Sequence, residues 1–178
     1  MRCPVGYKAG FSLLAVALQC GCTGPALPRF EATLAATDSA TRGLATWCEA
    51  RHLANPARIS ARRIQGDDAP RPAEARAFTG YRHVRLSCGN SVLSEAHNWY
   101  ARDRLSPEMN RVLDTTDTPF GTVAAPLGFR RERLSATRGA ALGCPRGTIL
   151  SHRARLVLPD GKPLALLVEC YTQANLKS

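Results

Sequence analysis

The sequence predicts a single α+β domain, in which helices pack on one face of an antiparallel β-sheet and a ligand cavity lies between the sheet and the helices. Three observations lead to this class. The 178 residues suffice for one compact domain. Segments 80–100 and 149–173 show strand-like patterns interrupted by turn residues, which is typical of hairpins. Two other segments combine N-capping residues with apolar residues at helical spacing.

The first 22 residues have the pattern of an export signal. Arg2 and Lys8 are basic, no acidic residue occurs, and FSLLAVAL at 11–18 is an apolar core too short to span a bilayer. We therefore expect an exported protein, either periplasmic or held at the envelope. The alternative is a disordered cytoplasmic leader.

The end of this segment also resembles a lipoprotein cleavage site. Gly21 precedes Cys22, although Gln19 stands where an aliphatic residue is usual. Residues 1–22 are thus a signal peptide or a lipoprotein-type leader, with a membrane anchor through Cys22 as one option. The folded domain is expected over 30–178.

The chain is basic, with 24 Lys and Arg against 14 Asp and Glu. The arginines are spread along the chain and no nucleic-acid-binding motif occurs, so a small anionic ligand or a negative surface fits better than nucleic acid. We expect a monomer whose partner is a small aromatic or cyclic carboxylate.

Four cysteines fall in the predicted domain, an even number that an oxidising compartment can pair into two disulfides. Three pairings are possible and the sequence does not choose among them. No C-x-x-C occurs, and the histidines at 52, 83, 97 and 152 lack the spacing of metal ligands. We therefore expect no metal site. The cysteines are Cys48, Cys88, Cys144 and Cys170.

Along the chain, a first helix is predicted over 37–53, where Asp38 and Ser39 are candidate caps. A strand is predicted over 58–64 and a loop over 65–75. The next segment, 80–100, alternates around a Gly-Asn turn and predicts a hairpin.

On the first strand of that hairpin, Arg82 shares a face with Val84 and Leu86. If the two apolar residues face the core, Arg82 also points inward.

A second helix is predicted to begin after Ser106, because a capping hydroxyl precedes Pro107 and Glu108. It should end before 116–119, since the residue before a proline resists helical dihedral angles. Pro119-Phe120-Gly121 is predicted as a turn whose glycine lets the backbone come close to another element. Segment 129–134, FRRERL, is interpreted as a basic surface segment.

The last hairpin turns at Asp160-Gly161, and its closing strand is apolar on both faces, which predicts a central strand. Glu169 on this strand is therefore a buried acid. A buried carboxylate needs a charged partner, hydrogen-bond donors or a proton. Arg82 is the expected partner, either as a structural ion pair or across a small ligand cavity.

The order of these signals resembles the chorismate lyase family. The residues that carry the resemblance are the arginine strand, SEAHNWYARDRLSPEMNRVL at 94–113, TDTPFG at 116–121 and DGKPLALLVECY at 160–171. The resemblance covers roughly 75–173 and implies a chorismate lyase-like α+β fold. It also implies elimination of pyruvate from chorismate, which gives 4-hydroxybenzoate for ubiquinone biosynthesis, without metal or organic cofactor.

The resemblance also implies the site residues. Arg82 would hold the ring carboxylate, the Phe120 amide would donate a hydrogen bond, and Glu169 would lie beside the oxygen that becomes the phenol or act as a base. Arg82 and Glu169 are then the catalytic residues, and Cys48 lies near a further substrate contact. Cys170 departs from the family pattern, where a large apolar residue follows the acid.

Other functions stay open at this point. If active, the protein is a carbon–oxygen lyase. It can instead be an exported, non-catalytic protein that binds a small carboxylate in the same pocket, because a related fold serves as the effector-binding domain of some bacterial transcription regulators. A third alternative is a structural envelope protein whose cavity has closed.

Overall fold

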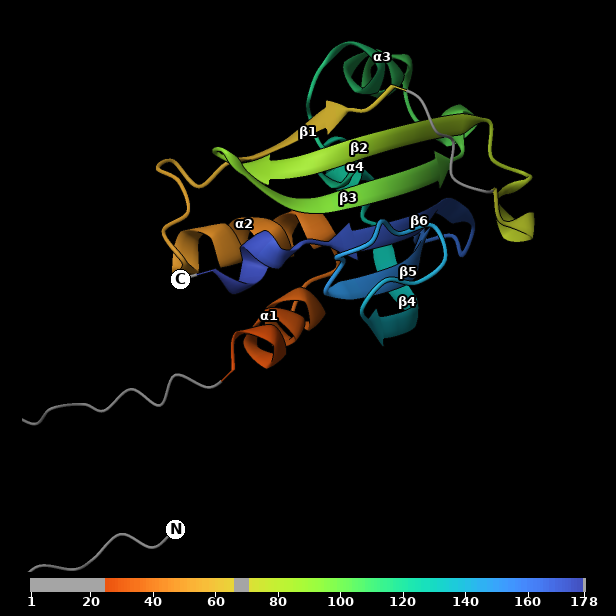
Figure 1. Ribbon diagram of the computed structural model, residues 1–178. Helices are drawn as coiled ribbons and strands as arrows, with labels where there is room; N and C mark the ends of the chain where they lie inside the picture. The colour runs from red at the N-terminus through yellow and green to blue at the C-terminus, as the bar shows by residue number, and fades with distance from the viewer. Residues whose placement is uncertain (1–24, 66–70, 178) are drawn as a thin grey trace, which may run out of the picture.

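One antiparallel sheet of six strands organises the protein (Figure 1). The computed structural model describes residues 25–65 and 71–177. The strand order is β1-β2-β3-β6-β5-β4, and each neighbouring pair is antiparallel. With the helices described below, this is the α+β domain that the sequence predicts. The strands are β1 (Ile59–Arg63), β2 (Gly80–Cys88), β3 (Ser91–Tyr100), β4 (Arg130–Arg138), β5 (Leu150–Val157) and β6 (Pro163–Tyr171).

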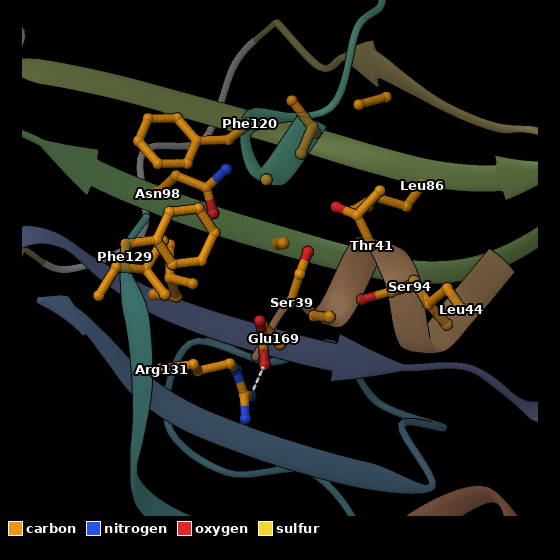
Figure 2. Close-up of a pocket in the computed structure, with 17 residues that line it drawn as sticks. Ser39, Thr41, Leu44, Leu86, Ser94, Asn98, Phe120, Phe129, Arg131 and Glu169 are labelled. Atoms are coloured by element: carbon orange, nitrogen blue, oxygen red, sulfur yellow. Dashed lines mark hydrogen bonds and ion pairs between the residues drawn. The ribbon is translucent and has the colours of Figure 1, made fainter. Parts of the chain in front are cut away.

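In the described residues four α-helices accompany the sheet, and α2 and α4 cover the face that carries the cavity described below (Figure 2). Short 3₁₀ turns η1 (Ala73–Ala75), η2 (Arg102–Arg104) and η3 (Ala125–Leu127) lie between other elements, and η4 (Gln173–Leu176) follows β6. The α-helices are α1 (Ala26–Ala35), α2 (Ala40–Ala50), α3 (Pro107–Thr115) and α4 (Phe120–Ala124).

Two helix predictions are confirmed by their caps. The helix predicted over 37–53 is α2, and the side chain of Ser39 accepts a hydrogen bond from the Arg42 amide. The helix predicted after Ser106 is α3, in which Ser106 accepts from the Met109 amide. Both caps satisfy an amide that the first turn of a helix leaves unpaired.

The two predicted hairpins are also present. β2 and β3 join at Gly89, whose φ is 53°, and β5 and β6 join through a turn in which Gly161 has a φ of 82°. Glycine adopts these left-handed angles without steric cost. β6 lies between β3 and β5, as its two apolar faces predict.

Three segments differ from the sequence-based expectation. α1 precedes the helix that the sequence predicts as the first; its N-cap, Pro25, makes no side-chain cap bond, so no start signal marked it. The segment 129–134 was predicted as a basic surface segment, but most of it belongs to the edge strand β4. Pro119-Phe120-Gly121 was predicted as a turn, but Pro119 is the N-cap of α4.

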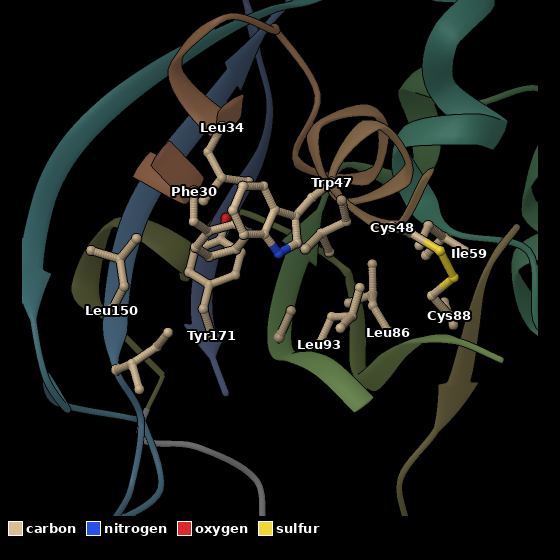
Figure 3. Close-up of a cluster of buried hydrophobic side chains, with 14 of the residues drawn as sticks. Phe30, Leu34, Trp47, Cys48, Ile59, Leu86, Cys88, Leu93, Leu150 and Tyr171 are labelled. Atoms are coloured by element: carbon tan, nitrogen blue, oxygen red, sulfur yellow. A yellow bond between two sulfur atoms is a disulfide. The ribbon is translucent and has the colours of Figure 1, made fainter. Parts of the chain in front are cut away.

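The main core lies where α1 and α2 pack together with the sheet (Figure 3). The Phe30 ring lies 5.2 Å from the Trp47 ring and 5.2 Å from the Tyr171 ring, measured between centroids. The indole N–H of Trp47 donates to the Asn175 carbonyl, which ties α2 to η4. These contacts join the first helices to the end of the chain.

All four cysteines of the described residues form disulfides, Cys48–Cys88 and Cys144–Cys170. The first bridge links α2 to the end of β2 (Figure 3). The second fastens the loop before β5 to β6. Of the three pairings that the sequence allows, this is the one adopted.

In the ranges 25–65 and 71–177, no helix is both long and apolar enough to cross a bilayer. The predicted leader, residues 1–22 with Cys22, lies outside the described residues.

Candidate functional site

A cavity of about 40 Å³ lies between the inner face of the sheet and helices α2 and α4 (Figure 2). A volume of this size holds about three water molecules. All six strands contribute to its wall, which places the cavity where the sequence predicts it. The apolar part of the wall consists mainly of Leu44, Val84, Leu86, Phe120, Phe129, Leu156 and Leu167, and the polar part of Ser39, Thr41, Ser94, Asn98, Arg131 and Glu169.

Glu169 is the buried acid that the sequence predicts, and its partner is Arg131 of β4 (Figure 2). Their side chains are 5% and 6% exposed. The Tyr171 hydroxyl donates to the same carboxylate oxygen, Oε2, over 3.0 Å. Burial acts to lower the pKa of Arg131, but the attraction of Glu169 and Tyr171, together with the hydrogen bond to Glu169, outweighs it and raises that pKa. The charge of Glu169 is therefore compensated within the protein.

His152 of β5 extends this network. Its Nδ1 accepts a hydrogen bond from Arg131 Nη2 over 3.4 Å and lies 3.9 Å from Glu169 Oε2. Burial, opposed in part by attraction to Glu169, lowers the pKa of His152 to about 4. At neutral pH the ring is uncharged, so the network holds one positive and one negative side chain.

Arg82 occupies a different place. It points inward from β2 and is 1% exposed, yet it does not line the cavity described above. Its guanidinium donates to the carbonyl oxygens of Thr118 and Thr116, over 3.1 and 3.4 Å, and so anchors the loop before α4. Burial and repulsion from Arg63 lower the pKa of Arg82. Arg82 is thus hydrogen-bonded to backbone carbonyl oxygens and is not paired with Glu169.

The other residues implied by the resemblance are divided between the cavity and the core. The side chain of Phe120 lines the cavity at the start of α4. Cys48 does not line the cavity, and its sulfur is bonded to Cys88. Of the four residues Arg82, Phe120, Glu169 and Cys48, only Phe120 and Glu169 line the cavity.

The polar groups at the cavity that have no hydrogen-bond partner in the described part of the chain include the Asn98 side-chain amide, Glu169 Oε1 and Arg131 Nε, whereas Glu169 Oε2 takes both bonds given above. Asn98 is 6% exposed. Neither Asn98 nor Arg131 was singled out from the sequence. The hairpin register was the available signal for Asn98, because it sets Asn98 opposite Arg82 on the inward face.

A larger groove of about 1080 Å³ adjoins the cavity and shares four residues with it, Ser39, Thr41, Gly121 and Phe129. A Cβ atom on Gly121 would lie 2.6 Å from Ser39 Oγ. The prediction that this glycine allows a close approach is therefore confirmed, and the approach brings α4 to the start of α2. The charged residues of the groove are Asp38, Arg42, Arg58 and Asp117.

Comparisons with known proteins identify one relative in sequence. No protein-family model matches the chain. Protein y4mC of Sinorhizobium fredii is 38% identical over 173 residues, which cover 82% of this chain and 73% of y4mC. The chain belongs to the y4mC family. That name states no activity, so membership alone assigns this y4mC-family protein no reaction.

Several solved structures share the fold at low sequence identity. A ligand-binding domain of a GntR-family regulator from Bordetella bronchiseptica is 18% identical, with a TM-score of 0.44, over 65% of this chain and 83% of that one. The regulator YydK of Bacillus subtilis is 16% identical, with a TM-score of 0.45, over 67% and 60%. A GntR-family regulator of Enterococcus faecalis is 14% identical, with a TM-score of 0.43, over 67% and 97%. These likenesses concern the fold and carry no information about a ligand.

The prediction of a chorismate lyase is wrong for this y4mC-family protein. The lyase chemistry required Arg82 and Glu169 to face one hollow, but Arg82 binds the backbone before α4 and Glu169 is paired with Arg131. The implied roles in 4-hydroxybenzoate formation and ubiquinone biosynthesis, and the lipoprotein assignment, find no support.

Proposed function

We propose that this protein binds a small, uncharged molecule in the cavity between the sheet and helices α2 and α4. The observation that carries the proposal is the pair of unpartnered polar groups, the Asn98 amide and Glu169 Oε1, in a wall that is otherwise mostly apolar. A ligand with an apolar body and one or two hydrogen-bonding groups would fit such a wall and supply partners for these two groups.

The charges of the wall favour a neutral ligand. Arg131 already compensates Glu169, and no other cationic side chain lines the described cavity. A ligand carboxylate would meet Glu169 Oε1 without an unpaired cation to receive it, which is unfavourable at a buried site. We therefore expect a ligand that donates a hydrogen bond, through a hydroxyl or an amide N–H, and not the small carboxylate that the sequence predicted.

The volume sets how such a ligand would lie. About 40 Å³ accommodates only the innermost part of an organic molecule. The groove of about 1080 Å³ begins at the same four residues, so the rest of the ligand would extend into it. Phe129, which is half-buried and lines both spaces, would contact the ligand at the rim.

Three probes of similar shape test the proposal on the full chain: benzyl alcohol, toluene and benzoate. Benzyl alcohol offers a donor, toluene offers none, and benzoate carries a charge. We expect benzyl alcohol to raise the melting temperature and to shift the NMR signals of Asn98 and Glu169 in a saturable manner, because binding to the folded state alone stabilises it. The two other probes should act at least tenfold more weakly.

A matched pair of variants controls for non-specific effects. Asn98→Leu removes the cavity amide and should weaken benzyl alcohol binding at least tenfold. Asn90→Ser alters an exposed asparagine in the β2–β3 turn and should leave binding unchanged. Equal responses to benzyl alcohol and toluene, or no response at Asn98 and Glu169 with any probe, would overturn the proposal in favour of a closed, structural cavity.

We also propose that the protein is exported to an oxidising compartment. Two disulfides that use all four cysteines of residues 25–65 and 71–177 support this location, because disulfides persist in such compartments. The test is osmotic-shock fractionation of the tagged full chain beside a chain that lacks residues 2–22. The full chain should be released with both disulfides intact, and retention of both chains inside the cell would contradict export.

A further inference from the structure

Three potential metal ligands meet on the face of the sheet opposite the cavity. Val84 and Ala96 line the cavity, so their neighbours His83, Glu95 and His97 point to the other side. His83 and His97 are directly opposite each other in the β2–β3 register, and their rings stack with centroids 4.1 Å apart. One ligand atom from each of the three residues lies within 4.8 Å of the others.

The cluster is largely buried but reachable. His83 is 7% exposed and His97 is 3% exposed, whereas 16% of the Glu95 side chain is exposed. His83 Nε2 lies 2.8 Å from Glu95 Oε1. The other nitrogen of this ring, Nδ1, is buried and has no hydrogen-bond partner in the described residues. A buried nitrogen without a partner is unusual in a folded protein.

We propose that His83, Glu95 and His97 bind a divalent transition-metal ion of the zinc type. Imidazole suits zinc and its neighbours, whereas Mg²⁺ and Ca²⁺ prefer oxygen ligands. Zinc bonds of about 2.0–2.1 Å in a tetrahedral site place ligand atoms about 3.3 Å apart. The three groups therefore need to approach one another by at most about 1.5 Å.

The surroundings already orient two of the ligands. The Tyr81 hydroxyl lies 2.9 Å from His97 Nδ1, and Arg85 Nε donates to Glu95 Oε2 over 3.1 Å. Glu95 Oε1 is directed to His83 Nε2, 2.8 Å away. Contacts of this kind behind metal ligands fix their orientation.

Three protein ligands leave a fourth tetrahedral position for water or an outside group. The ion would connect β2 to β3 on the face that carries no part of the proposed small-molecule cavity. The metal site consequently does not depend on the proposed function.

Zinc chloride titrated into the full chain tests the site. Iodoacetamide treatment without reductant first blocks Cys3, Cys20 and Cys22, so that free thiols do not bind the metal. Calorimetry should then show one zinc ion per chain. His97→Asn and Glu95→Gln should weaken binding at least tenfold, whereas His52→Asn, at an exposed histidine elsewhere, should leave it unchanged.

A second measurement on the unaltered protein guards against variants that fail to fold. Cobalt(II) bound to two imidazoles and a carboxylate should give visible absorption that zinc removes, and zinc should shift the ring signals of His83 and His97 in NMR spectra. Zinc binding of equal strength in all variants, no stoichiometric binding, or unshifted ring signals of both histidines at saturation would overturn the proposal.

Discussion

At the scale of single residues, the stability of the inner face of the sheet depends most on the buried ion pair between Glu169 and Arg131. Removal of one partner leaves an uncompensated charge among apolar side chains. We predict that Glu169→Leu and Arg131→Leu each lower the free energy of unfolding by about 3–5 kcal/mol. The double variant should lose much less than the sum, since it buries no unpaired charge. Urea denaturation of the four proteins measures this cycle.

An exposed pair provides the control for that cycle. Glu108 and Arg111 are paired on α3 with side chains 66% and 62% exposed. Glu108→Gln should leave the free energy of unfolding almost unchanged, because exposed pairs contribute little. Losses of similar size for Glu108→Gln and Glu169→Leu would show that the buried charge has relaxed into solvent.

His152 predicts a pH dependence of stability. Its pKa falls from 6.5 to about 4 on folding, so the unfolded chain binds more protons between these values. The contribution of His152 is present in full above pH 6.5 and is lost as the pH falls towards 4. The free energy of unfolding of the wild type minus that of His152→Gln should decline by about 3 kcal/mol over this range. A flat difference curve would mean that the ring is protonated in the fold.

The sequence predicted the burial of Glu169 but not its partner. Burial follows from alternation within one apolar strand, which is a local property. The partner is chosen by strand order, and β4 reaches Glu169 only through the intervening β5. Arg131 lies in a segment without apolar alternation, because the exposed edge strand has little to bury. The periodicity therefore gave no reason to prefer Arg131 over other arginines.

At the scale of elements, the N-cap of α3 gives a direct test. Ser106 accepts a hydrogen bond from the Met109 amide over 3.1 Å. Ser106→Ala should lower the free energy of unfolding by about 1 kcal/mol, since it leaves that amide unpaired. Ser60→Ala on β1 is a matched control, because Ser60 is also exposed and caps no helix. Equal urea midpoints for the two variants would contradict the role of the cap.

Elements with local signals were predicted well, and elements made by packing were not. Turn glycines and capping hydroxyls marked both hairpins, α2 and α3. α1 has no side-chain cap; its Phe30 and Leu34 are buried by contacts with elements distant in the chain. Packing of this kind stabilises a helix that no local signal in its sequence predicts.

At the scale of the whole molecule, the predicted packing of helices on one face of the sheet was enough to predict the position of the cavity. It was not enough to predict which polar groups line it. A single sheet with helices on one face leaves space between them where the packing is imperfect, as it is here. Which polar groups remain unpaired there depends on every partner of Glu169 and Asn98, and these come from several strands. The His83–Glu95–His97 cluster was missed for the same reason, because a hairpin register joins residues whose spacing in sequence looks arbitrary.

The two disulfides predict how the molecule as a whole responds to reduction. Cys48–Cys88 closes a loop of 40 residues and Cys144–Cys170 one of 26. Loop entropy assigns about 3–4 kcal/mol to each, with the longer loop favoured by only about 0.4 kcal/mol. Replacing both cysteines of either bridge by alanine should lower the free energy of unfolding by that amount. The quadruple variant should show additive losses, because the bridges belong to separate core clusters.

Reduction of the wild type tests the same role without substitutions. Dithiothreitol should shift the urea midpoint of the wild type and leave that of the quadruple variant unchanged. An unshifted midpoint for a wild type whose cysteines are shown to be reduced would contradict a stabilising role for both bridges.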